Sequence, residues 1–278
     1  MCLILFGYKV SKKYPLVLAA NRDEFYQRPT APMHLWKNTP GILAGKDLEQ
    51  GGTWFGVHKN GTFAALTNYR DPASIRSEAP SRGEIIINFL ESNKPTETHF
   101  ARLKKKKNPY NGFNLLFGNK EDLFWFSNLN DTIEKIAPGI HGLSNQFLDT
   151  PWPKVESGKK ALQDIICGTI TSESLFAMLA DQSVPDDDQL PQTGVGLEWE
   201  RMLSPLFIQS DTYGTRSSTA MLMDQNGTIE ITERTYDPQN KRTYKDHRVI
   251  ISSQSQDQRI ERYTPSKPMA SKNRIDPC

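Results

Sequence analysis

The first part of the chain alternates short hydrophobic runs with polar turns, a pattern typical of β-hairpins. Residues 2–8 and 16–20 are apolar at nearly every position, which predicts two paired strands buried on both faces. Residues 53–58 and 62–67 form a second pair around an Asn-Gly turn, since Asn-Gly tolerates the positive φ angles of a tight hairpin. The chain therefore begins as antiparallel sheet.

Apolar residues at helical spacing follow and predict helices at residues 81–90, 96–106, 152–166 and 171–180. The first helix should begin with a capping box, because Ser81 stands three residues before Glu84 and each side chain can accept a backbone N–H. Residues 181–196 are acidic, contain proline and show no periodicity, so we expect a loop there.

Further short strands are expected between and after the helices, at residues 113–117, 123–127, 133–140, 206–209, 215–223, 228–236 and 248–251. Antiparallel strands kept apart from helices are typical of the α+β class, with the helices covering the outer faces of the sheets. We expect one domain over residues 1–251, followed by a polar tail over residues 252–278 with few large apolar residues.

The composition of the 278 residues is that of an ordinary globular protein, with 37% hydrophobic and 24% charged residues. A formal net charge of +2 predicts no strong field, so neither nucleic acid nor an anionic membrane is expected as a partner. The three cysteines, at positions 2, 167 and 278, are too scattered for a disulfide framework or a structural zinc site. No GxGxxG or P-loop pattern indicates a bound nucleotide.

The hydrophobic runs are all shorter than the roughly 18 residues that a membrane-spanning helix needs, so no integral membrane association is expected. The start of the chain lacks a basic leader and reaches Lys9 too soon for a secretory signal. Few cysteines favour a reducing compartment. Together these features predict a cytoplasmic protein.

The first candidate for chemistry is Cys2, directly behind the initiator methionine. Removal of Met1 would put a thiol and a free α-amine on one residue, with ordinary pKa values of about 8.5 and about 7.7–8.0. The amine could then serve as base for the thiol, the logic of the N-terminal threonine hydrolases. The structural alternative is that Cys2 packs as a small apolar residue at the start of a buried strand.

Two of the predicted strands end directly in polar residues. Asn21, Arg22 and Asp23 follow the second strand without glycine or proline, so the extended backbone can continue through them. Alternation along a strand places Asn21 and Asp23 on one face and Arg22 on the other. Asn68 and Tyr69 end a later strand in the same way.

These motifs resemble those of the NRDE family, the homologues of transport and Golgi organisation protein 2. The shared segments are Met1-Cys2, Ala19-Ala20-Asn21-Arg22-Asp23-Glu24-Phe25-Tyr26, Gly51-Gly52-Thr53-Trp54, Leu66-Thr67-Asn68-Tyr69, Tyr110-Asn111-Gly112-Phe113-Asn114-Leu115, Gly142-Leu143-Ser144-Asn145, Thr150-Pro151-Trp152 and Tyr213-Gly214-Thr215-Arg216. Matches in this order over most of the chain make an accidental resemblance improbable. The resemblance implies an N-terminal-nucleophile (Ntn) hydrolase-like αββα sandwich and intracellular haem binding and trafficking, with haem as bound cargo.

A more distant resemblance is to the cysteine Ntn hydrolases, which combine an N-terminal cysteine with arginine, aspartate and asparagine. It implies a site built from Cys2, Arg22, Asp23, Asn68, Asn145 and Arg216. Arginine lowers the pKa of a neighbouring thiol, and amide N–H groups can bind an oxyanion. Because Arg22 and Asp23 adjoin here, both cannot face the thiol from an extended strand. We expect Asp23 or Asn21, rather than Arg22, on the inward face.

Two alternative functions therefore follow from these resemblances. A haem carrier needs an apolar slot, which aromatic residues near the expected site could line: Phe25, Tyr26, Trp36, Trp54, Phe55 and Tyr69. Cys2, His58 and His141 have the chemistry of axial ligands. The alternative is an N-terminal-cysteine hydrolase acting on an amphiphilic amide or thioester.

Overall fold

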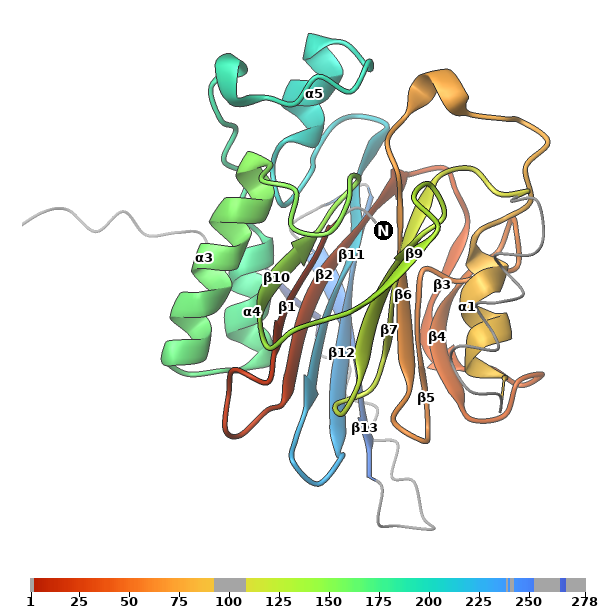
Figure 1. Cartoon of the computed structure of the whole chain (residues 1–278), viewed down its shortest axis with the longest axis vertical. Helices are drawn as coiled ribbons and strands as arrows, with labels where there is room; N and C mark the ends of the chain where they lie inside the picture. The colour runs from red at the N-terminus through yellow and green to blue at the C-terminus, as the bar shows by residue number, and fades with distance from the viewer. Residues whose placement is uncertain (1–2, 93–108, 239, 241–242, 253–265, 269–278) are drawn as a thin grey trace, which may run out of the picture.

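The computed structural model describes residues 3–92, 109–238, 240, 243–252 and 266–268. In this part of the chain two seven-stranded antiparallel sheets pack face to face (Figure 1). Sheet A has the strand order β10-β1-β2-β11-β12-β13-β14, and sheet B runs from β3 to β9 in sequence order. Sheet B is thus a meander of consecutive hairpins, whereas sheet A contains strands from both ends of the described chain, β1 and β14.

The strands of sheet A are β1 (Leu3–Tyr8), β2 (Leu16–Phe25), β10 (Gly139–Leu143), β11 (Tyr213–Met223), β12 (Ile229–Tyr236), β13 (Thr243–Ile251) and β14 (Ser266–Pro268). Those of sheet B are β3 (Thr30–Leu35), β4 (Ile42–Asp47), β5 (Phe55–His58), β6 (Phe63–Asn68), β7 (Phe113–Gly118), β8 (Leu123–Ser127) and β9 (Thr132–Lys135).

Helices cover the outer face of each sheet (Figure 1). α3 (Pro153–Cys167) and α4 (Ser172–Leu179) lie on sheet A, and α1 (Gly83–Leu90) lies on sheet B. α5 (Leu197–Leu203) stands above the strand ends instead, and the short 3₁₀ turns are η1 (Pro72–Ser74) and η2 (Asp187–Gln189). The layers form an αββα sandwich, which confirms the predicted α+β class. No helix among the described residues is both long enough and apolar enough to cross a membrane.

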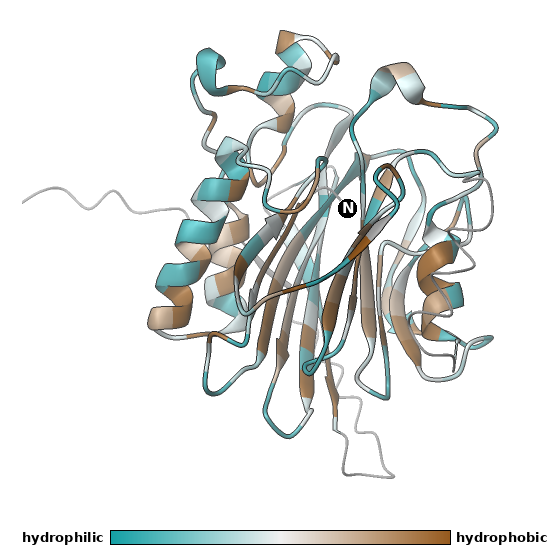
Figure 2. Ribbon diagram, viewed as in Figure 1, coloured by the Kyte–Doolittle hydropathy of each residue, from teal (hydrophilic) through white to brown (hydrophobic). Residues whose placement is uncertain are grey.

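The pleat of β1 and β2 divides their apolar residues between two cores. Ile4 and Leu18 pack in the core between the sheets, whereas Leu3 and Val17 pack against the helices on the outer face. Figure 2 shows the resulting hydrophobic strands, in brown, with polar residues on the loops. Even-numbered residues of β1 and β2 therefore face sheet B, and odd-numbered residues face the helices.

The Asn-Gly hairpins were predicted correctly, as were the helices near residues 152–166 and 171–180. The predicted helix at 96–106 falls outside the described residues. The capping box is wrong: α1 begins at Gly83, and no side-chain hydrogen bond caps it. Ser81 accepts a hydrogen bond from the Gly83 backbone, while the Glu84 carboxylate is taken by the Tyr110 hydroxyl.

Other elements differ for identifiable reasons. Residues 206–209 form no strand, because the Phe207 N–H donates to the Asp181 carbonyl and the Ile208 N–H to the Thr215 hydroxyl, which leaves an isolated bridge between Gln209 and Gly214. β3 was not predicted, because a proline within a strand is tolerated only at the edge of a sheet and therefore weakens the strand signal. Its pairing with β4 also contains a bulge. Within the expected polar tail, β14 pairs with β13 and extends sheet A.

Candidate functional site

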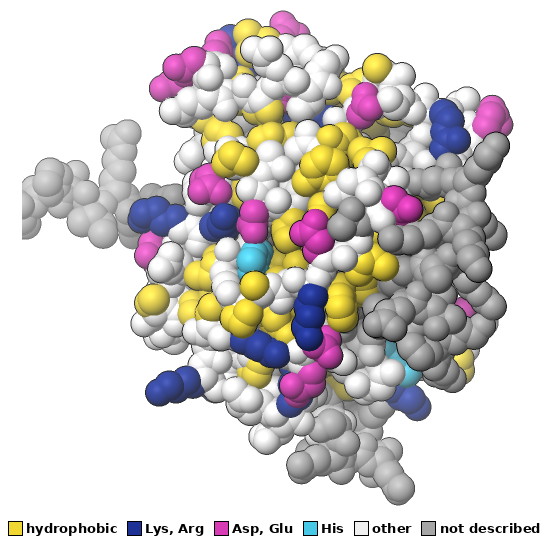
Figure 3. All heavy atoms as spheres, in the orientation of Figure 1, with side chains coloured by type: hydrophobic (Ala, Val, Ile, Leu, Met, Phe, Trp, Pro, Cys, Tyr) yellow, Lys and Arg dark blue, Asp and Glu magenta, His cyan; other side chains and the backbone are white. Residues whose placement is uncertain are grey.

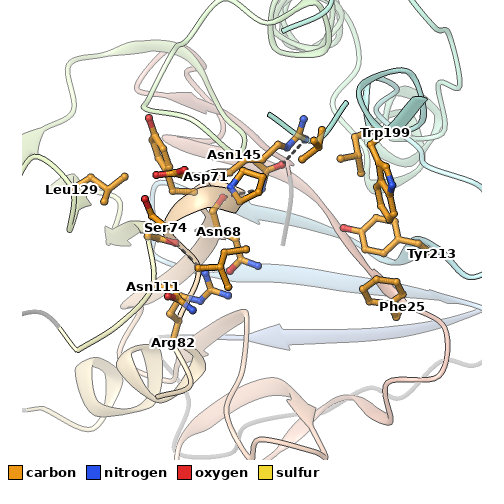
Figure 4. Close-up of a pocket in the computed structure, with 17 residues that line it drawn as sticks. Phe25, Asn68, Asp71, Ser74, Arg82, Asn111, Leu129, Asn145, Trp199 and Tyr213 are labelled. Carbon is orange, nitrogen blue, oxygen red and sulfur yellow. Dashed lines mark hydrogen bonds between the residues drawn. The ribbon is translucent and has the colours of Figure 1, made fainter. Parts of the chain in front are cut away.

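A pocket of about 280 Å³ opens at one end of the sandwich (Figure 4). It lies where β2 ends at Phe25, β6 ends at Asn68 and β11 begins at Tyr213. Antiparallel pairing of Phe25 with Tyr213 brings the two strand ends together, and Asn145 enters from the loop after β10. In the space-filling view, hydrophobic side chains gather in the upper half of this face, between α5 and the segment after β6 (Figure 3).

One wall of the pocket is aromatic. The Tyr213 ring packs edge-on against Phe25 at 5.1 Å and against Trp199 of α5 at 6.2 Å, measured between ring centroids. The Phe25 and Trp199 side chains remain 50% and 43% exposed, so both offer free ring surface to a ligand. Figure 4 shows the three rings one after another along one side of the pocket.

The opposite wall is largely polar: it carries the side chains of Asn68, Asp71, Ser74, Asn111 and Arg82, with the apolar Leu129 beside them (Figure 4). Asn145 joins the two sheets here, because its Nδ2 donates to the Asn68 carbonyl at 2.8 Å. The structure thus brings the two predicted asparagines together. With one wall aromatic and the other polar, the pocket suits an amphiphilic molecule.

Arg70 also lines the pocket and was not among the predicted site residues. Its Nη1 pairs with Glu200 Oε2 of α5 at 2.9 Å, and its Nη2 donates to Asn145 Oδ1 at 3.3 Å. The guanidinium also lies 4.9 Å from the centre of the Trp152 ring. Glu200 is 130 positions away from Arg70, so no local signal links them. Only the motif position of Arg70, next to Tyr69 at a strand end, hinted at a role.

The neighbouring predicted residues Asn21, Arg22 and Asp23 are divided between the two faces of β2. Asn21 Nδ2 donates to the Leu179 and Leu206 carbonyls, and Asp23 Oδ1 accepts from the Thr215 hydroxyl. Both side chains therefore make these hydrogen bonds on the face of sheet A that the helices cover. The expectation that one of them, rather than Arg22, faces the Cys2 thiol stays a prediction, because Cys2 lies outside the described residues.

Arg22 occupies the space between the sheets, with its guanidinium 4.1 Å from the centre of the Trp54 ring of sheet B. A β-bulge lies nearby in β11, where the register with β2 shifts between Thr215 and Ser217. The residue in the bulge, Arg216, uses its Nη1 to donate to the Phe25 and Arg28 carbonyls. The side chains of β2 thus alternate regularly between the two faces of sheet A, and this alternation places Arg22 between the sheets.

Burial shapes the charges around Arg22. Burial lowers the pKa of Arg22, with Glu24 opposing the shift from 3.9 Å and Arg216 reinforcing it. Arg22 is only 4% exposed, and its Nη1 has no hydrogen-bond partner among the described residues. Burial also raises the pKa of Glu233, on β12, to about 7. This part of the interface between the sheets therefore holds a guanidinium with spare hydrogen-bonding capacity.

The remaining predicted residues are dispersed. Cys2 falls outside the described residues. Tyr69 lines the pocket, whereas Trp54 and Phe55 belong to the core between the sheets. His58 ends β5 at the hairpin, away from the pocket end of the sheet, and His141 pairs with Asp149 beside α3.

Trp36 and Tyr26 also lie outside the pocket lining: Trp36 Nε1 donates to the Ala44 carbonyl, and the Tyr26 hydroxyl packs beside Gly214. Among the described residues, no three His, Cys, Asp or Glu side chains gather where they could hold a metal ion. The pocket thus draws on Phe25, Tyr69, Asn68 and Asn145 from the predicted set.

Comparison with known proteins matches residues 1–238 to the family described as Transport and Golgi organisation 2. The mouse Transport and Golgi organization 2 homolog is 34% identical over 256 residues, covering 84% of this chain and 92% of its own. The Drosophila melanogaster Transport and Golgi organization protein 2 is 29% identical over 267 residues, with the same coverage.

Among solved structures, a variant of the conjugated bile acid hydrolase from Clostridium perfringens superposes with a TM-score of 0.50. The superposition covers 99% of this chain and 100% of that one, at 10% sequence identity. At this identity the likeness concerns the fold alone: the two chains share the αββα sandwich.

Proposed function

This chain belongs to the Transport and Golgi organisation 2 family, and we propose that it binds haem, as cargo to be passed on, in the pocket at the end of its sandwich. The observation that carries the proposal is the division of the pocket into the aromatic wall of Phe25, Tyr213 and Trp199 and the facing polar wall. Haem is divided in the same way, since a flat apolar macrocycle carries two carboxylates at one edge.

Each wall offers the matching interaction. Aromatic rings bury large apolar surfaces and stack with offset or edge-on geometry, which suits the macrocycle. On the polar wall, the Arg82 Nη1 donates to the Gly112 carbonyl at 3.0 Å, which holds the guanidinium at the pocket, where its positive charge attracts a carboxylate. The side-chain amide of Asn68 can add a further donor.

The size of the pocket favours partial enclosure. About 280 Å³ is close to the lower end of the roughly 300–1,000 Å³ of small-molecule sites, so part of the macrocycle would stay outside. Among the described lining residues, Tyr69 and Tyr213 are the ones whose side chains serve as haem-iron ligands in proteins. A partly exposed haem without a histidine ligand suits a protein that must release its cargo.

Haem titration of matched variants tests the proposal through the haem absorption band. Trp199→Ala removes a ring of the wall and should weaken haem binding by about tenfold or more, the usual cost of losing an aromatic anchor. Leu197→Ala is the control, because Leu197 lies on the same helix with 48% exposure but does not line the pocket. Equal affinities of the two variants, or no haem binding by the unaltered protein, would contradict the proposal.

The second candidate is a hydrolase that uses the Cys2 thiol on an amphiphilic amide or thioester. Its support is the buried guanidinium of Arg22 with its spare Nη1, because a nearby arginine favours a thiolate. Asn68 and Asn145, joined at the same end of the sandwich, are candidate oxyanion donors. An acyl adduct seen by intact mass and lost in Cys2→Ala would favour this candidate; haem binding that survives Cys2→Ala without turnover favours the carrier.

A cytoplasmic location belongs to the proposal as well, on the grounds of the low cysteine content, which favours a reducing compartment. Fractionation of cells that express the full chain tests it. Recovery with a cytosolic marker is expected, and recovery inside an organelle would overturn it.

A further inference from the structure

α5 supplies the outermost part of the aromatic wall, yet it rests on neither sheet face. Figure 1 shows the helix above the strand ends, reached from the chain segment that follows α4. Trp199 and Leu203 of α5 line the pocket, and Val195 lines it just before the helix begins. A helix of only seven residues has little stability of its own, so its position depends on what holds it.

Two buried charged side chains hold α5. Glu200, 4% exposed, pairs with Arg70 through Oε2, while its Oε1 accepts from the backbone and hydroxyl of Thr193 at 2.7 and 2.6 Å. At the end of the helix, Lys154 of α3 is also 4% exposed and donates to the Leu203 carbonyl at 2.8 Å. The first contact attaches α5 to sheet B, and the second attaches it to the helix layer of sheet A.

The contact with Arg70 is the one that faces the pocket. The Arg70 backbone N–H donates to the Asn145 carbonyl at 2.8 Å, and its guanidinium reaches both Asn145 and Glu200. One side chain thus joins the end of β6, the loop after β10 and α5, which together make up most of the pocket. Trp199, one position before Glu200, stands beside Tyr213 only while α5 keeps this place.

We propose that the Arg70–Glu200 ion pair is the specificity-determining element of the pocket: it fixes α5 so that Trp199 completes the aromatic wall, which selects ring systems over single acyl chains. The selectivity part rests on the function proposed above, whereas the holding of α5 does not. Because the Trp199 and Tyr213 rings stand at 68° to each other, a broad planar ligand contacts both at once by stacking on one and meeting the edge of the other, but a narrow chain can pack against either ring alone. Release of α5 should therefore cost the planar ligand more.

Hydrogen exchange on the full chain without ligand tests the holding of α5. Glu200→Gln keeps the shape and the contact with Thr193 but sets an amide against Arg70, and Glu200→Ala removes both contacts. Breaking one side of a buried pair should speed amide exchange in residues 193–203 by about 100-fold or more in Glu200→Ala, and by less in Glu200→Gln. Unchanged exchange in both variants would overturn the proposal.

The control for this arm is Arg201→Ala, which breaks the exposed pair of Arg201 with Asp187 on the same helix. Surface pairs contribute little, so exchange in residues 193–203 should change by no more than about threefold. A change as large as that of Glu200→Ala would mean that any substitution on α5 loosens it, and would overturn a special role for Glu200.

Affinities for haem and for palmitate, measured on the same proteins, test the selectivity. Glu200→Gln should weaken haem binding by about tenfold and palmitate binding by less than about threefold, because only the planar ligand needs the completed wall. Equal losses for both ligands would indicate a merely structural role and overturn the selectivity. If the unaltered protein binds neither ligand, the proposed function and the selectivity fail together, while the exchange result still decides what holds α5.

Discussion

At the level of single residues, Glu233 links the packing of the two sheets to pH. It faces sheet B from β12, is 3% exposed, and accepts a hydrogen bond from the Met33 backbone of β3 at 2.6 Å. Burial raises its pKa from an ordinary 4.5 to about 7, against the opposing effects of the Met33 hydrogen bond and the Arg22 charge. Between these two pKa values, Glu233 therefore keeps its proton in the folded protein but loses it in the unfolded chain.

We expect Glu233→Gln to flatten the pH dependence of stability. The contribution of Glu233 is complete below its unfolded pKa and is lost as the pH rises through about 7. Glutamine keeps the acceptor for Met33 without titrating, so it should remove a fall of up to about 3 kcal/mol between about pH 5 and about pH 8. Urea unfolding at both pH values measures it, with the exposed Glu134→Gln as control; identical slopes for Glu233→Gln and the unaltered protein would contradict this account.

The orientation of single side chains could be predicted from the sequence only in part. Alternation separated Asn21 and Asp23 from Arg22 correctly, but the sequence alone did not say which face looks toward the other sheet. That choice depends on which apolar residues pack against the helices, and nearly every residue of β1 and β2 is apolar before the motif. The Arg70–Glu200 pair could not be predicted from the sequence, because it joins two segments that lie far apart along the chain.

At the level of elements, the loop after β10 is tied by His141 of that strand. Its Nδ1 lies 2.7 Å from Asp149 Oδ2 and its Nε2 lies 3.0 Å from the Ala137 carbonyl, so both ring nitrogens face acceptors. Only the imidazolium can donate to both. Burial and Lys159 oppose the charge, but the hydrogen bonds to Asp149 and Ala137 outweigh them and raise the pKa of His141.

The tie should weaken at alkaline pH. A raised pKa gives a stabilisation that is complete below the unfolded value and is lost as the pH rises through the folded one. His141→Gln should therefore cost about 1–2 kcal/mol of unfolding free energy near pH 6, and much less near pH 9. Thermal unfolding across this range checks it against His34→Gln, an exposed histidine of β3; a cost independent of pH would refute a charged tie.

Elements with strong local signals were predictable and the others were not. Hairpins with Asn-Gly turns and helices with a clear apolar face emerged from the sequence, since turn chemistry and periodicity are local. α5 did not, because seven residues with mixed polarity are too few to show a period. Its place is decided by the distant partners Arg70 and Lys154.

For the molecule as a whole, the two-sheet sandwich gathers the pocket at one end. Antiparallel pairing places the end of β2 beside the start of β11, and the sheet packing brings the end of β6 to Asn145. The class and layers could be predicted from the order of elements together with the family resemblance. The division of the pocket into an aromatic and a polar wall could not, because it arises from contacts between both sheets and α5.

The central claim is that this pocket holds haem. Hydrogen exchange of the full chain with and without haem tests it most directly, since a bound ligand slows exchange where it stabilises structure. We predict slower exchange in residues 68–75, 195–203 and 213–216, around the pocket. Haem-dependent protection confined to the opposite end, at the turns of residues 59–62 and 224–228, or no protection at all, would contradict the account.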